Sequence, residues 1–237
     1  MKISILGDSI STFEGVTPPD YQIYYRGSKR IENDLSSYDD TWWAQVIHFL
    51  HGTLCVNNAY SGCKVSKGIF PSASSEKRIE RLHGHTEPDL ILIYVGINDF
   101  GFNVPISKKR LLFSKPDPDY FFDAYTLMLK HIQQRYPNSK AICGTLLKTY
   151  IKNTTDWNFN TDFHTLHRLE DYNAAIRQIC KKRKAICADL NKNDCAAYET
   201  LDGAHPTRVG HKQIAKCWIT ALDSINLNPD KSHTIML

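Results

Sequence analysis

Long apolar runs are missing from this sequence of 237 residues. No stretch reaches the roughly 18 consecutive apolar residues that a membrane-spanning helix needs. The apolar run near the N-terminus is interrupted by Ser4 and Gly7, so it does not have the uniform core of a signal peptide. We therefore expect no contact with a membrane and, provided that Met1 is the native start, a cytoplasmic protein.

Paired cysteine motifs are missing as well. The seven cysteines contain no Cys-x-x-Cys, and most of them lie inside apolar runs, which fits buried thiols in a reducing compartment. The histidine pairs His83/His85 and His164/His167 have no zinc-ligand pattern beside them. We expect no disulfide framework, no metal and no other cofactor.

A strong excess of one charge and a glycine-rich phosphate loop are also missing. The net charge is +4, and the basic clusters at 108–110 and 181–184 lie beside predicted helices without interleaved aromatic residues. Such clusters favour solvated helix ends over a nucleic-acid site. A phosphate- or nucleotide-binding protein of flavodoxin-like fold remains an alternative, but neither Gly-x-Gly-x-x-Gly nor Gly-x-x-x-x-Gly-Lys occurs. We expect no nucleic-acid partner, and the oligomeric state stays open.

The composition is that of an ordinary globular chain. With 42% hydrophobic and 23% charged residues, a chain of this length can bury a full core. We expect one domain over residues 1–226 and a tail over 227–237.

Apolar segments alternate with amphipathic ones along the chain, which predicts a single doubly wound α/β domain with three α/β/α layers. Asp117 and Pro118 have the residue types of a helix N-cap and of the first helical position. Strands are expected at 3–7, 54–56, 89–95, 141–146 and 185–190. Helices are expected at about 40–51, 73–82, 117–136, 166–182 and 207–225. The segments 11–39 and 148–164 are predicted to be long loops bordering the site.

Reactive side chains follow several of these strands. Ser9 comes directly after the first strand, where ligands bind in open α/β sheets, so it is a candidate nucleophile; a simple capped turn is the alternative. Asp202 and His205 are separated by a short turn containing Gly203. That turn can set the carboxylate against one imidazole nitrogen and leave the other free to take a proton. An Asp-Gly turn beside an N-cap histidine is the alternative.

Two candidate hydrogen-bond donors follow the next strands. Gly62 can offer a backbone N–H and Asn98 a side-chain amide, which are the groups that stabilise a developing oxyanion in acyl transfer. Both residues are also common turn formers. Asp99 is interpreted as a turn or cap residue.

Together these segments resemble the four sequence blocks of the SGNH, or GDSL-like, serine hydrolases, in the order of that family. The blocks are Gly7-Asp8-Ser9-Ile10-Ser11, Gly62, Gly96-Ile97-Asn98-Asp99 and Asp202-Gly203-Ala204-His205. The chain lacks the Gly-x-Ser-x-Gly elbow of the common α/β-hydrolases.

The resemblance implies a flavodoxin-like, five-stranded parallel sheet in the order 2-1-3-4-5. It also implies Ser9 as nucleophile, with Asp202 and His205 as its partners. The oxyanion hole would consist of the Ser9 and Gly62 N–H groups and the Asn98 side chain.

The long loops suggest the substrate. Their aromatic residues are mixed with polar ones, which suits a polar alcohol such as a sugar better than a long acyl chain. We expect a small-molecule ester with a short acyl group, acetyl above all, and Asp8, Tyr25 and Trp157 as substrate contacts. The aromatics could instead only pack the loops onto the domain. Two alternatives remain. The protein could be a lipase, lysophospholipase or thioesterase of the same family, or a non-catalytic carbohydrate-binding relative. The complete triad argues against a non-catalytic protein.

Overall fold

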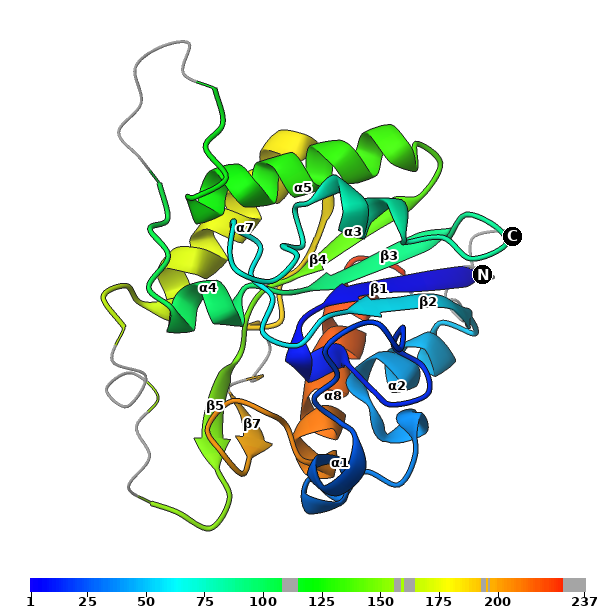
Figure 1. The fold of residues 1–237 in the computed structure, drawn as a ribbon, viewed down its shortest axis with the longest axis vertical. Helices are drawn as coiled ribbons and strands as arrows, with labels where there is room; N and C mark the ends of the chain where they lie inside the picture. The colour runs from blue at the N-terminus through cyan, green and yellow to red at the C-terminus, as the bar shows by residue number, and fades with distance from the viewer. Residues whose placement is uncertain (108–114, 156–158, 160–164, 193–194, 196, 228–237) are drawn as a thin grey trace.

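The computed structural model describes residues 1–107, 115–155, 159, 165–192, 195 and 197–227. Its centre is a parallel sheet of five strands in the order β2-β1-β3-β4-β6 (Figure 1). The strands of this sheet are β1 (Lys2–Gly7), β2 (Thr53–Ala59), β3 (Leu90–Tyr94), β4 (Lys140–Gly144) and β6 (Ile186–Ala188). Because β6 is the fifth strand of this sheet along the chain, the predicted flavodoxin-like order is confirmed.

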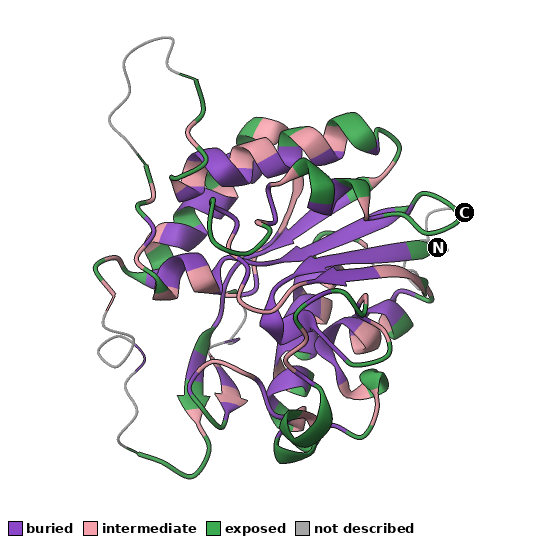
Figure 2. Ribbon diagram, viewed as in Figure 1, coloured by how far each residue is buried: buried purple, intermediate pink, exposed green. Residues whose placement is uncertain are grey.

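Burial explains why these segments form the sheet. All five residues of β3 are buried, as expected for a strand covered by helices on both faces. Figure 2 shows the strands as a buried layer, whereas the outer faces of the helices are exposed.

Helices cover both faces of the sheet (Figure 1). On one face α2 (Trp42–Phe49) packs against α8 (Arg208–Ser224), and on the other α5 (Phe121–Arg135) packs between α3 (Glu76–Glu80) and α7 (Leu169–Arg183). Shorter helical segments lie in the connections: η1 (Ser9–Ser11), α1 (Gly27–Glu32), η2 (Tyr38–Asp40) and α4 (Ile97–Gly101).

Two details differ from the sequence prediction. The expected loop 148–164 begins with β5 (Lys148–Ile151), which pairs in parallel with β7 (Ala197–Thr200) in a separate small sheet. Helix α5 begins at Phe121 and not at Pro118, because the N–H groups of Phe121 and Phe122 donate to the Pro105 and Ile106 carbonyls and not to Asp117 and Pro118.

The cysteines also depart from expectation. Cys195 and Cys217 form a disulfide with a Cα–Cα distance of 5.6 Å, which joins the segment before β7 to α8. Cys63, Cys143 and Cys180 are buried free thiols, as predicted. The argument from free thiols to a reducing compartment therefore loses part of its basis. Among the described helices, none combines the length and the apolar character that crossing a bilayer requires.

Candidate active site

Ser9 lies in a tight turn at the carboxyl end of β1. It opens the short helix η1, and Asp8 caps that helix by accepting a hydrogen bond of 3.1 Å from the Ile10 N–H. The chain therefore stops running along the sheet at Gly7, and the Ser9 hydroxyl is presented at the edge where the strands end.

His205 links Ser9 to Asp202. Its Nε2 lies 2.9 Å from the Ser9 Oγ, and its Nδ1 lies 2.8 Å from the Asp202 Oδ2. These two contacts assign the Nδ1–H tautomer, in which Nε2 can accept the serine proton. The pair precedes α8, on the loop after β7.

The Asp202 carboxylate is held by four contacts although its side chain is 44% exposed. Its Oδ1 accepts hydrogen bonds from the N–H groups of Ala204 and His205, at 3.0 and 2.8 Å. Burial alone would raise the pKa of Asp202, but the hydrogen bond and charge of His205, together with these N–H donors, hold it well below its usual range. Asp202 is thus built to stay ionised beside the imidazole.

A cavity of about 240 Å³ opens beside Ser9 and His205. Most of its remaining wall is apolar or uncharged. The lining residues are Ser9, Ile10, Ile97, Asn98, Gly101, Phe102, Ala204 and His205. The cavity is therefore large enough for a small group attached to the serine.

Three candidate donor groups follow the carboxyl ends of β1, β2 and β3. The Ser9 N–H stands in the first turn of η1, where N–H groups have no partner within the helix. The Gly62 N–H donates no hydrogen bond to any described residue, and Gly62 has a φ of 77°, in the left-handed region that favours glycine. Asn98 donates one amide hydrogen to the Cys63 carbonyl at 2.8 Å, which leaves the second available.

Asp99 ties two of these donors together. It is fully buried, and its carboxylate accepts hydrogen bonds from the Val65 and Ser66 N–H groups at 2.7 and 3.0 Å. The segment after Gly62 is thereby fixed to α4, the helix that carries Asn98. Asp99 is more than the turn or cap residue that the sequence suggested.

Two buried ionisable residues, Asp8 and Arg78, also support the turn that contains Ser9. Asp8 is 1% exposed, and burial raises its pKa to about 7, with the charge of Asp99 adding to the shift and the Ile10 N–H opposing it. Arg78 is equally buried and donates to the Gly7 carbonyl at 3.2 Å and to the Asn58 carbonyl at 2.7 Å. Nothing in the sequence distinguishes Arg78, because a charged residue in an amphipathic segment gives no sign that it will be buried.

The predicted substrate contacts lie elsewhere. Asp8 is covered by the turn that it caps, and Tyr25 is fully buried, with its hydroxyl donating to the Pro206 carbonyl at 2.8 Å. Neither lines the cavity, which corrects both predictions. Trp157 lies outside the described residues. Phe159, from the same loop, is buried and stacks on Phe100.

Tyr24 is the residue beside Tyr25 that does reach the site. Its ring stacks on His205, and its hydroxyl donates to Asp202. From the sequence, Tyr24 is only one of the aromatic residues in the predicted loop 11–39. No local sequence pattern relates it to His205, which is far away in the chain.

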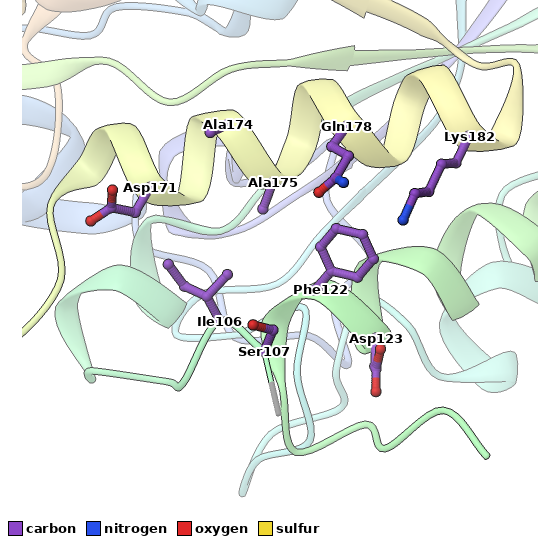
Figure 3. A pocket seen from close by; sticks show the side chains of 9 residues that line it. All are labelled: Ile106, Ser107, Phe122, Asp123, Asp171, Ala174, Ala175, Gln178 and Lys182. Carbon is purple, nitrogen blue, oxygen red and sulfur yellow. The ribbon is translucent and has the colours of Figure 1, made fainter. Parts of the chain in front are cut away.

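A larger cavity of about 390 Å³ lies between α5 and α7 (Figure 3). Its two acidic residues are already engaged in local structure: Asp123 accepts from the Asp117 N–H, and Asp171 accepts from the Arg168 N–H at the start of α7. Lys182 lies over the Phe122 ring, 5.0 Å from its centroid. The cavity near Ser9, although smaller, is lined by a serine and a histidine that contact each other, Ser9 and His205.

The GDSL-like lipase/acylhydrolase family model matches residues 1–222 of this chain. The chain is similar to the crystal structure of a candidate GDSL-like lipase from Bacteroides ovatus, with 28% identity and a TM-score of 0.70, over 94% of this chain and 98% of that one. A similar protein from Bacteroides uniformis gives 25% identity and a TM-score of 0.67, over 94% of both chains. No curated protein matches.

More distant structures share the fold alone. A family 3 carbohydrate esterase from Clostridium thermocellum is 16% identical with a TM-score of 0.56, over 95% of this chain and 96% of that one.

Proposed function

The chain belongs to the GDSL-like lipase/acylhydrolase family, and from that premise we propose that it is a serine esterase with Ser9, His205 and Asp202 as its catalytic triad. The observation that carries the proposal is the unbroken chain of contacts from the Ser9 Oγ through both imidazole nitrogens to the Asp202 carboxylate. Nucleophile, base and orienting carboxylate are in hydrogen-bond reach of one another.

The reaction proceeds through an acyl-enzyme. His205 Nε2 takes the proton of the Ser9 hydroxyl while Oγ attacks the ester carbonyl carbon, and the same proton then passes to the leaving alcohol. Water next attacks the acyl-serine with His205 again as base, which releases the carboxylic acid and restores Ser9. Asp202 keeps its charge throughout and stabilises the imidazolium that forms in each step.

The oxyanion of each tetrahedral intermediate is stabilised by the N–H groups of Ser9 and Gly62 and by the Asn98 amide. This assignment is supported by the absence of any other described partner for the Gly62 N–H and by the free hydrogen of the Asn98 amide. Donors that are fixed before the reaction need no rearrangement when the charge develops.

The acyl group is short, acetyl above all. A cavity of about 240 Å³ lies beside Ser9, which suits a small group better than a long chain. The alcohol is polar and of carbohydrate type. That part is supported by the fold shared with a carbohydrate esterase, whereas the loop aromatics now support it less, because Tyr25 and Phe159 are buried. A lipase, lysophospholipase or thioesterase activity is the competing assignment.

A fluorophosphonate probe read by intact-mass spectrometry tests the nucleophile. We expect one label on the wild-type protein, none on Ser9→Ala, and an unchanged label on Ser28→Ala, which alters an exposed serine in α1. Labelling that survives in Ser9→Ala would place the nucleophile elsewhere.

The acyl preference is tested with nitrophenyl esters from acetyl to dodecanoyl, run beside acetylated sugars. The proposal expects the highest kcat/KM for the shortest esters and release of acetate from the sugars. A maximum at octanoyl or longer, with the acetylated sugars untouched, would favour the lipase assignment.

A further inference from the structure

Tyr24 contacts both partners of Ser9 in the triad. Its ring lies parallel to the His205 imidazole, with 3.4 Å between ring centroids and 9° between the planes. Its hydroxyl donates a hydrogen bond of 2.9 Å to the Asp202 Oδ2, the same oxygen that faces the His205 Nδ1. Tyr24 therefore covers one face of the His205–Asp202 pair and binds its outer end.

The backbone of Tyr24 is tied to the nucleophile. Its N–H donates to the Thr12 Oγ1 at 3.0 Å, and that hydroxyl in turn donates to the Ser9 carbonyl at 2.9 Å. One residue thus spans both halves of the triad, through its side chain on one side and its main chain on the other.

We propose that Tyr24 is a positioning residue, which fixes the His205–Asp202 pair against Ser9 by stacking on the imidazole and by donating to the carboxylate. The inference rests on the proposed function, because positioning has meaning only if the triad acts. Tyr24 itself need not touch the ester.

The exposure of Asp202 is the reason that such a residue is needed. Without Tyr24, the Asp202 Oδ2 would face only His205 and solvent, and 44% of the side chain is exposed, so its ion pair with the imidazole would contribute little. The Tyr24 ring excludes water from one face of the imidazole, and the phenol completes a set of two donors on each carboxylate oxygen. Both effects hold Asp202 in line with the Nδ1–H.

Tyr24→Phe and Tyr24→Leu separate the two contacts. The phenylalanine keeps the stack and loses the donor, so kcat should fall about tenfold, the usual worth of one hydrogen bond to a charged group. Without the phenol, Asp202 acts more fully on the imidazolium, which shifts the acid limb of the kcat/KM profile to higher pH. The leucine loses the stack as well, and kcat should fall about 10²-fold with KM little changed.

Two controls separate positioning from general stability. Tyr38→Phe removes a hydroxyl from an exposed tyrosine that stacks on Trp43, and it should change neither kcat nor the pH profile. Tyr25→Phe removes the hydrogen bond to the Pro206 carbonyl on the same loop. It should lower the thermal midpoint while leaving the acid limb where it is.

The tautomer of His205 can be measured by NMR without any substrate, so this test does not depend on the esterase assignment. In protein labelled with ¹⁵N-histidine, with His205→Gln used to assign the signal, we expect a single Nδ1–H tautomer for His205 in the wild type and a mixture in Tyr24→Leu. Loss of rate with an unchanged tautomer and an unchanged pH profile would overturn the inference. If the wild-type protein hydrolysed no ester but Tyr24→Leu still changed the His205 tautomer, the proposed function would be overturned and the inference about Tyr24 would stand.

Discussion

Asp8 and Asp202 are carboxylates of the same site, but their environments shift the pKa in opposite directions. Asp8 lies beneath the nucleophile, 1% exposed, and burial raises its pKa to about 7. Asp202 lies at the surface, where His205 and two backbone N–H groups outweigh the effect of burial and lower its pKa. Two aspartates of one site therefore differ in pKa because burial dominates at Asp8, whereas the hydrogen-bond donors dominate at Asp202.

The difference extends to the two halves of the site. The nucleophile half, which contains the proposed nucleophile Ser9, belongs to the sheet: buried Arg78 and Asp99 hold the backbone beside Ser9 and Gly62 from inside the domain. The base half lies on a loop, and Tyr24 holds it from the surface. A substitution of the buried residues that support the first half should therefore affect folding, and one of the exposed residues in the second half should affect mainly the rate.

The base half is tested most directly by Asp202→Asn. An asparagine can offer its amide hydrogen to Nδ1 and so favours the wrong imidazole tautomer, and kcat should fall about 10³-fold or more. Because the side chain is largely exposed, the thermal midpoint should change little. Steady-state kinetics and thermal unfolding on the same preparation provide the check. A loss below about tenfold would mean that His205 does not need this carboxylate as an orienter.

The nucleophile half is tested by two arginines of one segment. Arg78→Met removes a buried donor from the Gly7 carbonyl and from the carbonyl and side-chain oxygens of Asn58, and the unfolding free energy should fall by about 3 kcal/mol or more. Arg81→Met is the matched control: its ion pair with Asp20 is exposed and should contribute about 1 kcal/mol or less. Urea unfolding of both variants measures the difference. Equal losses would show that burial of Arg78 does not make its contacts stronger.

The fold followed from the sequence wherever burial was continuous. The apolar runs of β1 and β3 predicted buried strands because strands covered on both faces must be apolar throughout. The pair β5–β7 was missed because both strands are short and mix polar with apolar residues. They also pair with each other across about fifty residues of sequence. The Cys195–Cys217 disulfide was missed for the same reason, because the spacing of two cysteines in the sequence does not give their distance in space.

The candidate site divides in the same way. Ser9, Asp202 and His205 were predicted together because the short blocks that contain them resemble those of the GDSL-like hydrolases in type and order. Tyr24 was not assigned its place, because a contact between residues 24 and 205 depends on how a loop folds back over the domain. Loop aromatics next to each other in sequence took opposite positions: Tyr24 reaches the site, whereas Tyr25 is buried behind it.

Asp8→Asn tests the comparison through the change of stability with pH, and its effect disappears at low pH. Asparagine can still cap η1, so the turn is kept, and only the ionisable group is removed. In the wild type the folded chain holds this proton up to about pH 7, whereas the unfolded chain releases it near the ordinary value of 3.8. Between these values the wild type loses stability as pH rises, by about 1.4 kcal/mol for each pH unit.

The variant lacks that loss, so its unfolding free energy relative to the wild type should rise from pH 4 to pH 7 and then level off. Asp202→Asn gives the opposite sign, because a carboxylate with a lowered pKa stabilises the fold above its unfolded value, and that contribution disappears as pH falls. Its size should be smaller, since solvent screens the exposed Asp202. Urea titrations at several pH values measure both slopes. If the difference in unfolding free energy between Asp8→Asn and the wild type were constant from pH 4 to pH 7, Asp8 would be ionised in the folded protein. The two carboxylates would then differ in exposure but not in the direction of their pKa shifts.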